Sequence, residues 1–416
     1  MEMSKFQAVE GMAIAGFSIS AFLICVIGFP VTIRLSRAIG LVDMPTERKN
    51  HKHATPLVGG ITFYLGFFII SALFAREWIN LSMFVWLGIV LAIGIYDDIA
   101  ELSAVNRLAA HAAIIVGIFA TDGLAVFSVG DILGTGPVMF VTPVAVCLTV
   151  IAVLGAVNSV NMIDGADGLL GSLVTVSLFT LLMISLVAPS DEFIHKSFST
   201  ADIATMLGAL VAFLLFNCRF FKLKQAVVFM GDAGSTAIGF CVVFLLIDFS
   251  QGNDPLISPV TAGWILGLPL LDASAVIGKR ILSGNSPIKA GRDHIHHLFL
   301  DAGYSVNQTV GALVLLHCLL VFIGVSAHLV VGVHADMFLF WLFVVAFCGY
   351  DFETGGRCSL GFAAIARAVN LMKYFGLILP FIAGNQHHGL FFIASGGFQN
   401  SFRGANCVPA PGVEID

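Results

Sequence analysis

Charged residues are scarce in this chain. Only 11% of its 416 residues are charged, whereas a soluble globular domain carries about 25%. Hydrophobic residues make up 58% of the sequence, and the mean hydropathy is +0.97. A soluble core of this length does not need so much apolar surface, so the natural solvent is the lipid bilayer. The composition excludes an ordinary soluble enzyme and predicts no nucleic-acid partner.

Several other features are also lacking. The 8 cysteines form no CxxC pair, and several lie within apolar runs, so we expect neither a disulfide framework nor a zinc site. No internal repeat and no low-complexity segment is detectable. The first apolar run is long and lacks a small-residue cleavage site before a polar region, so we expect a retained span rather than a cleaved signal peptide.

Long apolar runs dominate what is present. A bilayer core about 30 Å thick requires roughly 20 apolar residues in a helix. Suitable runs, of which the third is short, lie near 11–33, 57–75, 82–96, 106–121, 138–157, 168–188, 201–217, 234–249, 258–277, 309–331 and 336–350. We therefore predict an all-α, polytopic transmembrane bundle of about eleven spans, with its active site in cytoplasmic loops. Residues 1–350 form one membrane-embedded domain in this interpretation.

The distribution of Lys and Arg predicts the orientation. These residues gather in the loops that follow odd-numbered runs, whereas the loops after even-numbered runs hold only Arg76 and Lys196. Positive residues stay on the cytoplasmic side, so the odd loops are predicted inside and the N-terminus outside. The unusual polar clusters lie in the same odd loops, which assigns the function to the cytoplasmic face.

Two adjacent carboxylates, Asp97 and Asp98, end the third run. Such a pair is repulsive unless a cation lies between the two groups. Mg²⁺ prefers one or two carboxylates together with phosphate oxygens, so a metal is one explanation. A polar cap at the membrane edge is the alternative.

Between the fifth and sixth runs, polar residues recur in steps of three: Asn158, Asn161, Asp164 and Asp167. In one unbroken helix they would fan over half of the circumference. The nearby Gly165 and Gly168 instead favour a tight turn, which can bring the polar groups to one ligand. A loop of ordinary turn-forming residues is the alternative.

Asp232 lies between glycines and opens a new apolar run. The backbone amides at such a helix start favour anions, so a phosphate can approach there. A simple helix cap is the alternative.

Histidines form a further cluster, in the loop after the ninth run. His294, His296 and His297 follow Arg292, and histidines can bind metal, exchange protons or donate to phosphate. No cysteine partners for tight zinc are evident, so substrate contact is the better interpretation, and a solvated loop is the alternative. His51 and Lys52 lie in a basic loop that suits capture of a phosphate as well as positive-inside orientation.

Together, these clusters fit phosphoryl transfer on a lipid substrate, with Mg²⁺ (or Mn²⁺) neutralising charge. The set also resembles the polyprenyl-phosphate N-acetylhexosamine-1-phosphate transferase family, and the HIHH sequence resembles its N-acetylglucosamine branch. The stretches that carry the resemblance extend from about residue 30 to 310: PLVGG (56–60), YDD (96–98), NMIDGADGLLG (161–171), VFMGDAGST (228–236), ISPVTAGW (257–264) and HIHHL (294–298).

The resemblance implies roles for the clusters. Asp97 would deprotonate the lipid phosphate, Asp98 would bind metal or phosphate, and Asp232 would ligate Mg²⁺ directly. The remaining groups would hold the nucleotide, the diphosphate or the sugar: Asn158, Asn161, Asp164, Asp167, His51, Lys52, Arg292, His294, His296 and His297.

The implied reaction takes UDP-N-acetylglucosamine and undecaprenyl phosphate to undecaprenyl-diphospho-N-acetylglucosamine and UMP, at a bacterial inner membrane. Its product would begin O-antigen or enterobacterial-common-antigen glycans. Direct attack and a phospho-enzyme route both remain open, as does a homodimer.

The likeness weakens after residue 350. The tail 351–416 is apolar and glycine-rich and holds few basic residues. We expect little order there and assign it no function.

Other functions fit less well. A membrane prenyltransferase would carry two paired aspartate motifs, but Asp97-Asp98 has no second copy. A transporter would place polar residues at mid-span and show a repeat between its halves. A different N-acetyl amino sugar donor is the alternative within the family.

Overall fold

The computed structural model describes residues 2–45, 54–74, 81–100, 102–131, 135–188, 197–219, 223, 225–286 and 291–330. His51, Lys52, the expected last span 336–350 and the tail 351–416 lie outside the described residues.

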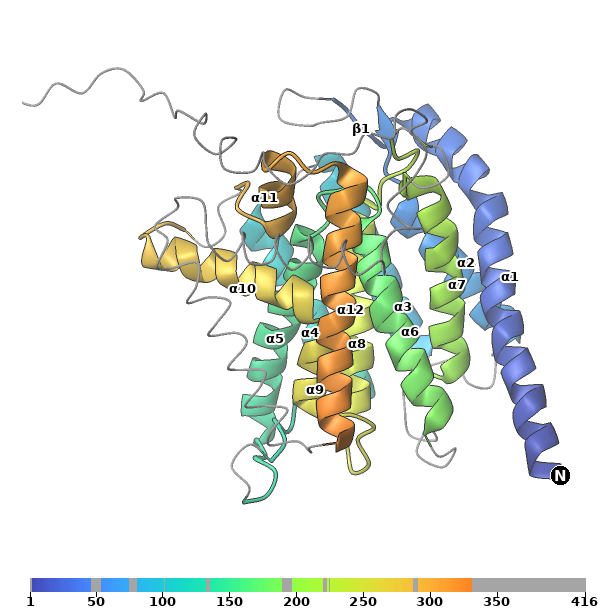
Figure 1. Ribbon diagram of the computed structural model, residues 1–416, viewed down its shortest axis with the longest axis vertical. Coiled ribbons are helices and arrows are strands. Elements are labelled where there is room, and N and C mark those ends of the chain that lie inside the picture. Colours follow the sequence, from blue (N-terminus) through green and yellow to red (C-terminus); the bar gives the residue numbers. More distant parts are fainter. Residues whose placement is uncertain are drawn as a thin grey trace, which may run out of the picture.

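The described residues form a helical bundle with a small hairpin near one end (Figure 1). The hairpin pairs β1 (Val42–Asp43) with β2 (Thr55–Pro56) in antiparallel fashion. The helices are α1 (Glu2–Ile39), α2 (Gly59–Phe74), α3 (Leu81–Ala100), α4 (Ala104–Asp122), α5 (Thr142–Met162), α6 (Leu169–Val187), α7 (Thr200–Asn217), α8 (Gly231–Ser250), α9 (Pro259–Ile265), α10 (Gly267–Leu282), α11 (Ile295–Asp301) and α12 (Val306–Val330).

Within this part of the chain, eight helices are long and apolar enough to cross a membrane, and the pair α9–α10 can supply a ninth span. Such a set fits a multi-pass membrane protein and confirms the all-α class. The first ten predicted runs each coincide with helical structure, but the count of about eleven is not confirmed. Helix α2, with 16 residues, is shorter than a full span.

The predicted span 258–277 contains a bend that its sequence did not indicate. The chain bends by 87° between α9 and α10, so that α10 lies across the direction of the other helices in Figure 1. Leu266 separates the two helices, and Ser177 of α6 donates to the carbonyl oxygen of Ile265 at 2.7 Å. This contact satisfies a carbonyl group at the break.

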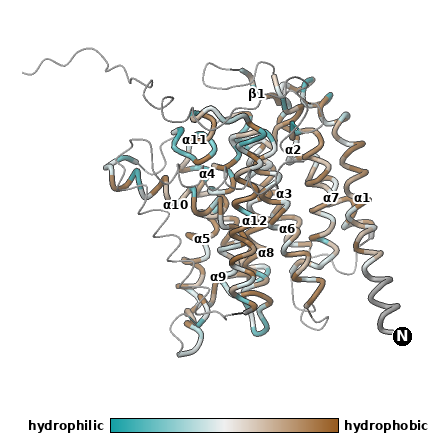
Figure 2. The backbone as a smooth tube through the Cα atoms, viewed as in Figure 1, coloured by the Kyte–Doolittle hydropathy of each residue, from teal (hydrophilic) through white to brown (hydrophobic). Residues whose placement is uncertain are grey.

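Helix α8 forms the centre of the bundle. Its residues from Ala233 to Ser250 are all buried, as expected for a helix that is apolar on every face. Helices α2, α3 and α5 pack around it. The outer helices present apolar side chains to the surroundings, whereas hydrophilic residues concentrate near the ends of the bundle (Figure 2).

Two of the sequence motifs form one packing unit at the start of α8. A Cβ atom on Gly60 would lie 2.1 Å from the Cα atom of Gly234, so α2 and α8 can begin side by side only with glycine there. The backbone N–H of Phe229 donates to Pro56, and that of Gly59 donates to Phe229. These contacts fix where α8 begins, and with it the position of Asp232 in its first turn.

Candidate active site

Asp98, at the end of α3, holds the start of α8. One oxygen of its carboxylate accepts the backbone N–H of Asp232 at 3.0 Å, and the other accepts that of Ala233 at 3.3 Å. Met230, the residue before α8, provides no side-chain cap. Asp98 therefore satisfies amides that the helix itself leaves unpaired, and this contact brings two predicted site residues together.

Asp97 faces a different partner. Its side chain is buried, and its two oxygens accept from the Arg107 guanidinium at 2.9 Å and from the backbone N–H of Leu102 at 2.7 Å. Arg107 also lies 3.5 Å from a carboxylate oxygen of Asp232. The cation between the acidic groups is thus an arginine from the first turn of α4. Arg107 is one of the basic residues after the odd-numbered runs that predict the orientation, and the sequence did not mark it as a site residue.

The predicted break after α5 is confirmed. Helix α5 ends at Met162, α6 begins at Leu169, and Gly168 between them has φ +85°, a left-handed conformation that glycine adopts without strain. Asn161 donates to the Thr236 hydroxyl of α8 at 3.3 Å. Asn158 donates to the carbonyl oxygen of Leu154 in its own helix at 2.7 Å.

Asp167 is tied to the loop before α8. It accepts from the Arg219 guanidinium at 2.7 Å and from the backbone N–H of Ala226 at 3.0 Å. Beside it, Asn217 accepts the Gly168 N–H at 2.7 Å and donates to Val228. Nothing in the sequence pattern marked Arg219 or Asn217, because both contacts join distant segments.

Asp164 lies exposed in the same turn. The pKa of its carboxyl is raised to about 7, because neighbouring protein displaces water and because Asp232 and Asp167 repel its charge. A bound cation would reverse the part of this pKa shift that comes from the repulsion. Asp164 and Asp232 therefore belong to one electrostatic cluster.

The histidine segment meets this cluster. His296, in the first turn of α11, is buried, and neither of its ring nitrogens has a hydrogen-bond partner within the described chain. A Cβ atom on Gly165 would lie 2.0 Å from its Nε2 atom. Burial, followed by the charges of His297, His294 and Arg292, lowers the pKa of His296 to about 3. The ring is therefore neutral near pH 7, with one donor and one acceptor to offer.

The other members of the segment are placed differently. The ring of His297 lies 4.2 Å from that of His296, and burial with neighbouring Arg292 lowers the pKa of His297 as well. His294 precedes α11 and contacts Asp272 of α10 at 2.8 Å. Arg292 forms an exposed ion pair with Asp301 at 3.2 Å. The histidines thus begin a short helix rather than occupy a solvated loop.

The carboxylates of this cluster suit a hard cation that also binds oxygen atoms of the substrate. No group of three His, Cys, Asp or Glu side chains in the described ranges is arranged to hold a metal ion. Asp232 is half-exposed, at 50% of its side-chain surface, and Asp98 adjoins it. Mg²⁺ is commonly held by one or two carboxylates plus substrate phosphates, and these two carboxylates fit that arrangement.

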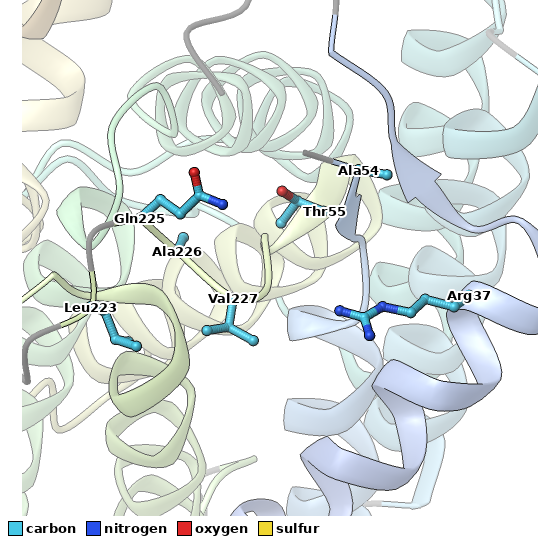
Figure 3. Close-up of a pocket in the computed structure, with 7 residues that line it drawn as sticks. All are labelled: Arg37, Ala54, Thr55, Leu223, Gln225, Ala226 and Val227. Atoms are coloured by element: carbon cyan, nitrogen blue, oxygen red, sulfur yellow. The ribbon is translucent and has the colours of Figure 1, made fainter. Parts of the chain in front are cut away.

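A cavity of about 380 Å³ opens beside Asp167. Arg37 of α1 and Thr55 of β2 line one side, and residues 223 and 225–227 line the other (Figure 3). Ala226 both lines the cavity and holds Asp167 through its N–H. The cavity therefore shares a wall with the polar cluster.

Comparisons with known proteins identify relatives of this chain. The profile of Glycosyl transferase family 4 matches residues 80–250. The chain is 34% identical over 359 residues, 85% of its length, to an undecaprenyl-phosphate alpha-N-acetylglucosaminyl 1-phosphate transferase of Escherichia coli O157:H7, and covers 93% of that relative. Identity to the protein of the same name from Salmonella typhi is 35% with the same coverage. For that of Haemophilus influenzae it is 35% over 294 residues, 70% of this chain and 79% of the relative.

Proposed function

The chain belongs to the polyprenyl-phosphate N-acetylhexosamine-1-phosphate transferase family, whose members transfer a sugar-phosphate, and we propose its substrates. The donor is UDP-N-acetylglucosamine, and the acceptor is undecaprenyl phosphate. The products are undecaprenyl-diphospho-N-acetylglucosamine and UMP. The enzyme works in the bacterial inner membrane with its site toward the cytoplasm, and its product begins O-antigen or enterobacterial-common-antigen glycans.

One observation carries this proposal. Asp97, Asp98, Asp164, Asp232 and Arg107, which come from separate parts of the sequence, meet at one end of an apolar bundle. A site at the membrane edge allows the phosphate of a lipid to meet a soluble nucleotide. Carboxylates that could hold a metal ion, next to the Arg107 guanidinium, suit a diphosphate, because phosphoryl transfer depends mainly on positioning and on charge stabilisation.

Each group has a proposed task. Mg²⁺, with Mn²⁺ as the alternative, would be held by Asp232 and Asp98 and would neutralise charge on the diphosphate. Arg107 lies 3.5 Å from Asp232 and would contact a phosphate group held next to that carboxylate. Asp97 holds Arg107 in place, and a role as the base that deprotonates the lipid phosphate stays a prediction. His296 offers an N–H to a phosphate oxygen or to the sugar.

We assign the nucleoside to the cavity beside Asp167. Ligand pockets commonly enclose about 300–1,000 Å³, and this cavity is in that range. Thr55 and Gln225 supply polar groups for a base, and Arg37 supplies a charge for a phosphate. His51 and Lys52 precede Thr55 in the sequence, and their phosphate contacts stay predictions.

The test is the release of UMP by the purified, folded protein. It is measured with and without undecaprenyl phosphate and Mg²⁺, for the wild type and for Asp232→Asn. Asp254→Asn, a change at an exposed aspartate beyond the other end of α8, serves as the matched control. We expect UMP only with both additions, near-normal activity in the control, and a loss of about 100-fold or more in Asp232→Asn, as for other transition-state charge partners.

The outcomes separate the parts of the proposal. Activity with another nucleotide-sugar but none with UDP-N-acetylglucosamine would show that the donor is wrong. Equal loss in Asp232→Asn and Asp254→Asn would refute the location of the site. No UMP release by the folded protein with any nucleotide-sugar donor would refute the proposed reaction.

A further inference from the structure

We propose that Asp272 is a positioning residue that fixes the His294 ring and the start of α11, and so places the catalytic histidines. This inference rests on the proposed function, because it concerns the histidines that we assign to the substrate. Asp272 lies on α10, was not singled out by the sequence, and is buried with 4% of its surface exposed. Its two carboxylate oxygens have separate tasks.

The first oxygen completes a helix. The backbone N–H of Ile295, the first residue of α11, donates to Oδ1 of Asp272 at 2.8 Å. His294 stands at the N-cap position but provides no side-chain cap. The first amides of a helix need outside partners, and here a carboxylate from another helix supplies one. The start of α11 is therefore attached to α10.

The second oxygen selects the state of a histidine. Oδ2 of Asp272 lies 2.8 Å from Nδ1 of His294. A carboxylate can only accept, so Nδ1 carries a proton, and when the ring holds a single proton its lone pair is on Nε2. The hydrogen bond at one ring nitrogen decides the role of the other. Asp272 thus determines what His294 can offer to a ligand.

The effect extends to the neighbouring rings. The His294 ring is nearly parallel to that of His296, at 5° and 5.9 Å between centroids, and His296 lies 4.2 Å from His297. His296 is buried against Gly165 of the central cluster. A turn of His294 or a shift of α11 would therefore move the ring that reaches the acidic cluster.

The element that carries Asp272 is itself held firmly. Ser177 donates to Ile265 at the break before α10, and His317 lies 3.2 Å from the same hydroxyl. Further along α10, Arg280 contacts Asp293 at 3.3 Å. A group that orients others needs such a rigid base. The bend between α9 and α10 consequently brings Asp272 to the segment 293–297.

The closing experiment compares Asp272→Asn, His294→Gln and the double variant, with Asp248→Asn as the matched control. Asp248 is equally buried and accepts the backbone N–H groups of Ser197 and Phe198, far from the histidines. We expect kcat for UMP release to fall about 10- to 100-fold in Asp272→Asn, by analogy with the loss of carboxylates that orient metal-binding histidines. The double variant should be no slower than His294→Gln alone.

A spectroscopic readout is independent of activity. In protein labelled with ¹⁵N at histidine and kept in mildly alkaline buffer, the His294 signals, assigned by their loss in His294→Gln, should show a proton on Nδ1. In Asp272→Asn the amide can donate to Nδ1, so the proton should move to Nε2. Asp248→Asn should leave these signals unchanged.

A wild-type His294 protonated on Nε2, additive losses in the double variant, or unchanged kcat in Asp272→Asn would each overturn the positioning role. The wild-type spectrum shows which nitrogen of His294 is protonated even if Asp272→Asn does not fold. A wild-type protein that releases no UMP would instead refute the proposed function. The spectrum would still test whether Asp272 determines which nitrogen of His294 is protonated.

Discussion

The contact between Gly165 and His296 predicts that one added methyl group disables the site. Gly165→Ala would place a Cβ atom 2.0 Å from Nε2 of His296 and 2.7 Å from its Cε1. Gly165 does not have a positive φ, so alanine suits the backbone and the whole effect is steric. His296 is 1% exposed and the His297 ring lies close by, so the imidazole has little room to retreat.

The magnitude follows from this lack of room. Relief of such a contact requires a shift of about 1 Å, and overpacking in a filled site costs about 1–3 kcal/mol. A misplacement of about 1 Å in a catalytic group can lower the rate about 100-fold. We therefore expect a loss of about 100-fold in kcat/KM for UDP-N-acetylglucosamine, with a modest fall in Tm.

The assay measures UMP release and thermal unfolding for Gly165→Ala beside Gly155→Ala. Gly155 lies within α5, and a Cβ atom there would meet no atom within 4 Å. Alanine at that position should stabilise the helix by about 0.5–1 kcal/mol and leave the rate unchanged. Wild-type kinetics in Gly165→Ala would refute the packing of His296 on the turn, and an equal loss in both variants would refute the steric reasoning.

Three further predictions concern charges and a turn. Arg107→Gln leaves the buried Asp97 carboxylate without its cation and should destabilise the protein by about 1–3 kcal/mol. This cost is lower than for breaking a fully buried ion pair, because the Arg107 side chain is 29% exposed. The double variant Arg107→Gln with Asp97→Asn should recover the wild-type Tm but not the wild-type kcat. The raised pKa of Asp164, about 7, makes the protonated acid more stable in the folded state than in the unfolded chain, where the pKa is about 3.9. Without divalent cations, Tm should therefore fall as pH rises from about 4 to about 7, and Asp164→Asn should flatten this slope. Asn217→Ala leaves the Gly168 N–H unpaired and should lower Tm, at a cost of about 1–3 kcal/mol.

Much of the bundle could be predicted because lipid imposes strong rules on sequence. A span must be apolar over a known length, so helices from α1 to α8 coincide with visible runs. The bend between α9 and α10 could not be seen. Residues 258–277 are mostly apolar, with Asp272 as their single charged residue, and the contacts that hold the break come from Ser177 and His317, far away in the sequence.

In the site, too, some residues could be predicted from the sequence and others could not. Asp164, Asp167 and Asp232 were predicted as site residues because each lies next to glycine between apolar runs. A charged residue near the membrane interior costs free energy, so its presence there indicates a function. Arg107 and Asp272 were missed because one arginine beside an apolar run and one aspartate within a run do not by themselves indicate a site. Their partners lie 10 and 22 residues away, and only the fold brings them together.

The adjacent pair Asp97-Asp98 gains a different explanation from the one its sequence suggested. Successive residues of a helix point about 100° apart, so two neighbouring carboxylates need not share one cation. Asp97 turns inward to Arg107, whereas Asp98 turns to the backbone amides at the start of α8, where the helix dipole also favours negative charge. The pair therefore joins the end of α3 to both α4 and α8, and Asp232 stands between these two attachments. Arg107→Lys should then lower UMP release less than Arg107→Gln does, because a single nitrogen of Arg107, Nη1, lies against both Asp97 and Asp232, and an ammonium group keeps that positive charge.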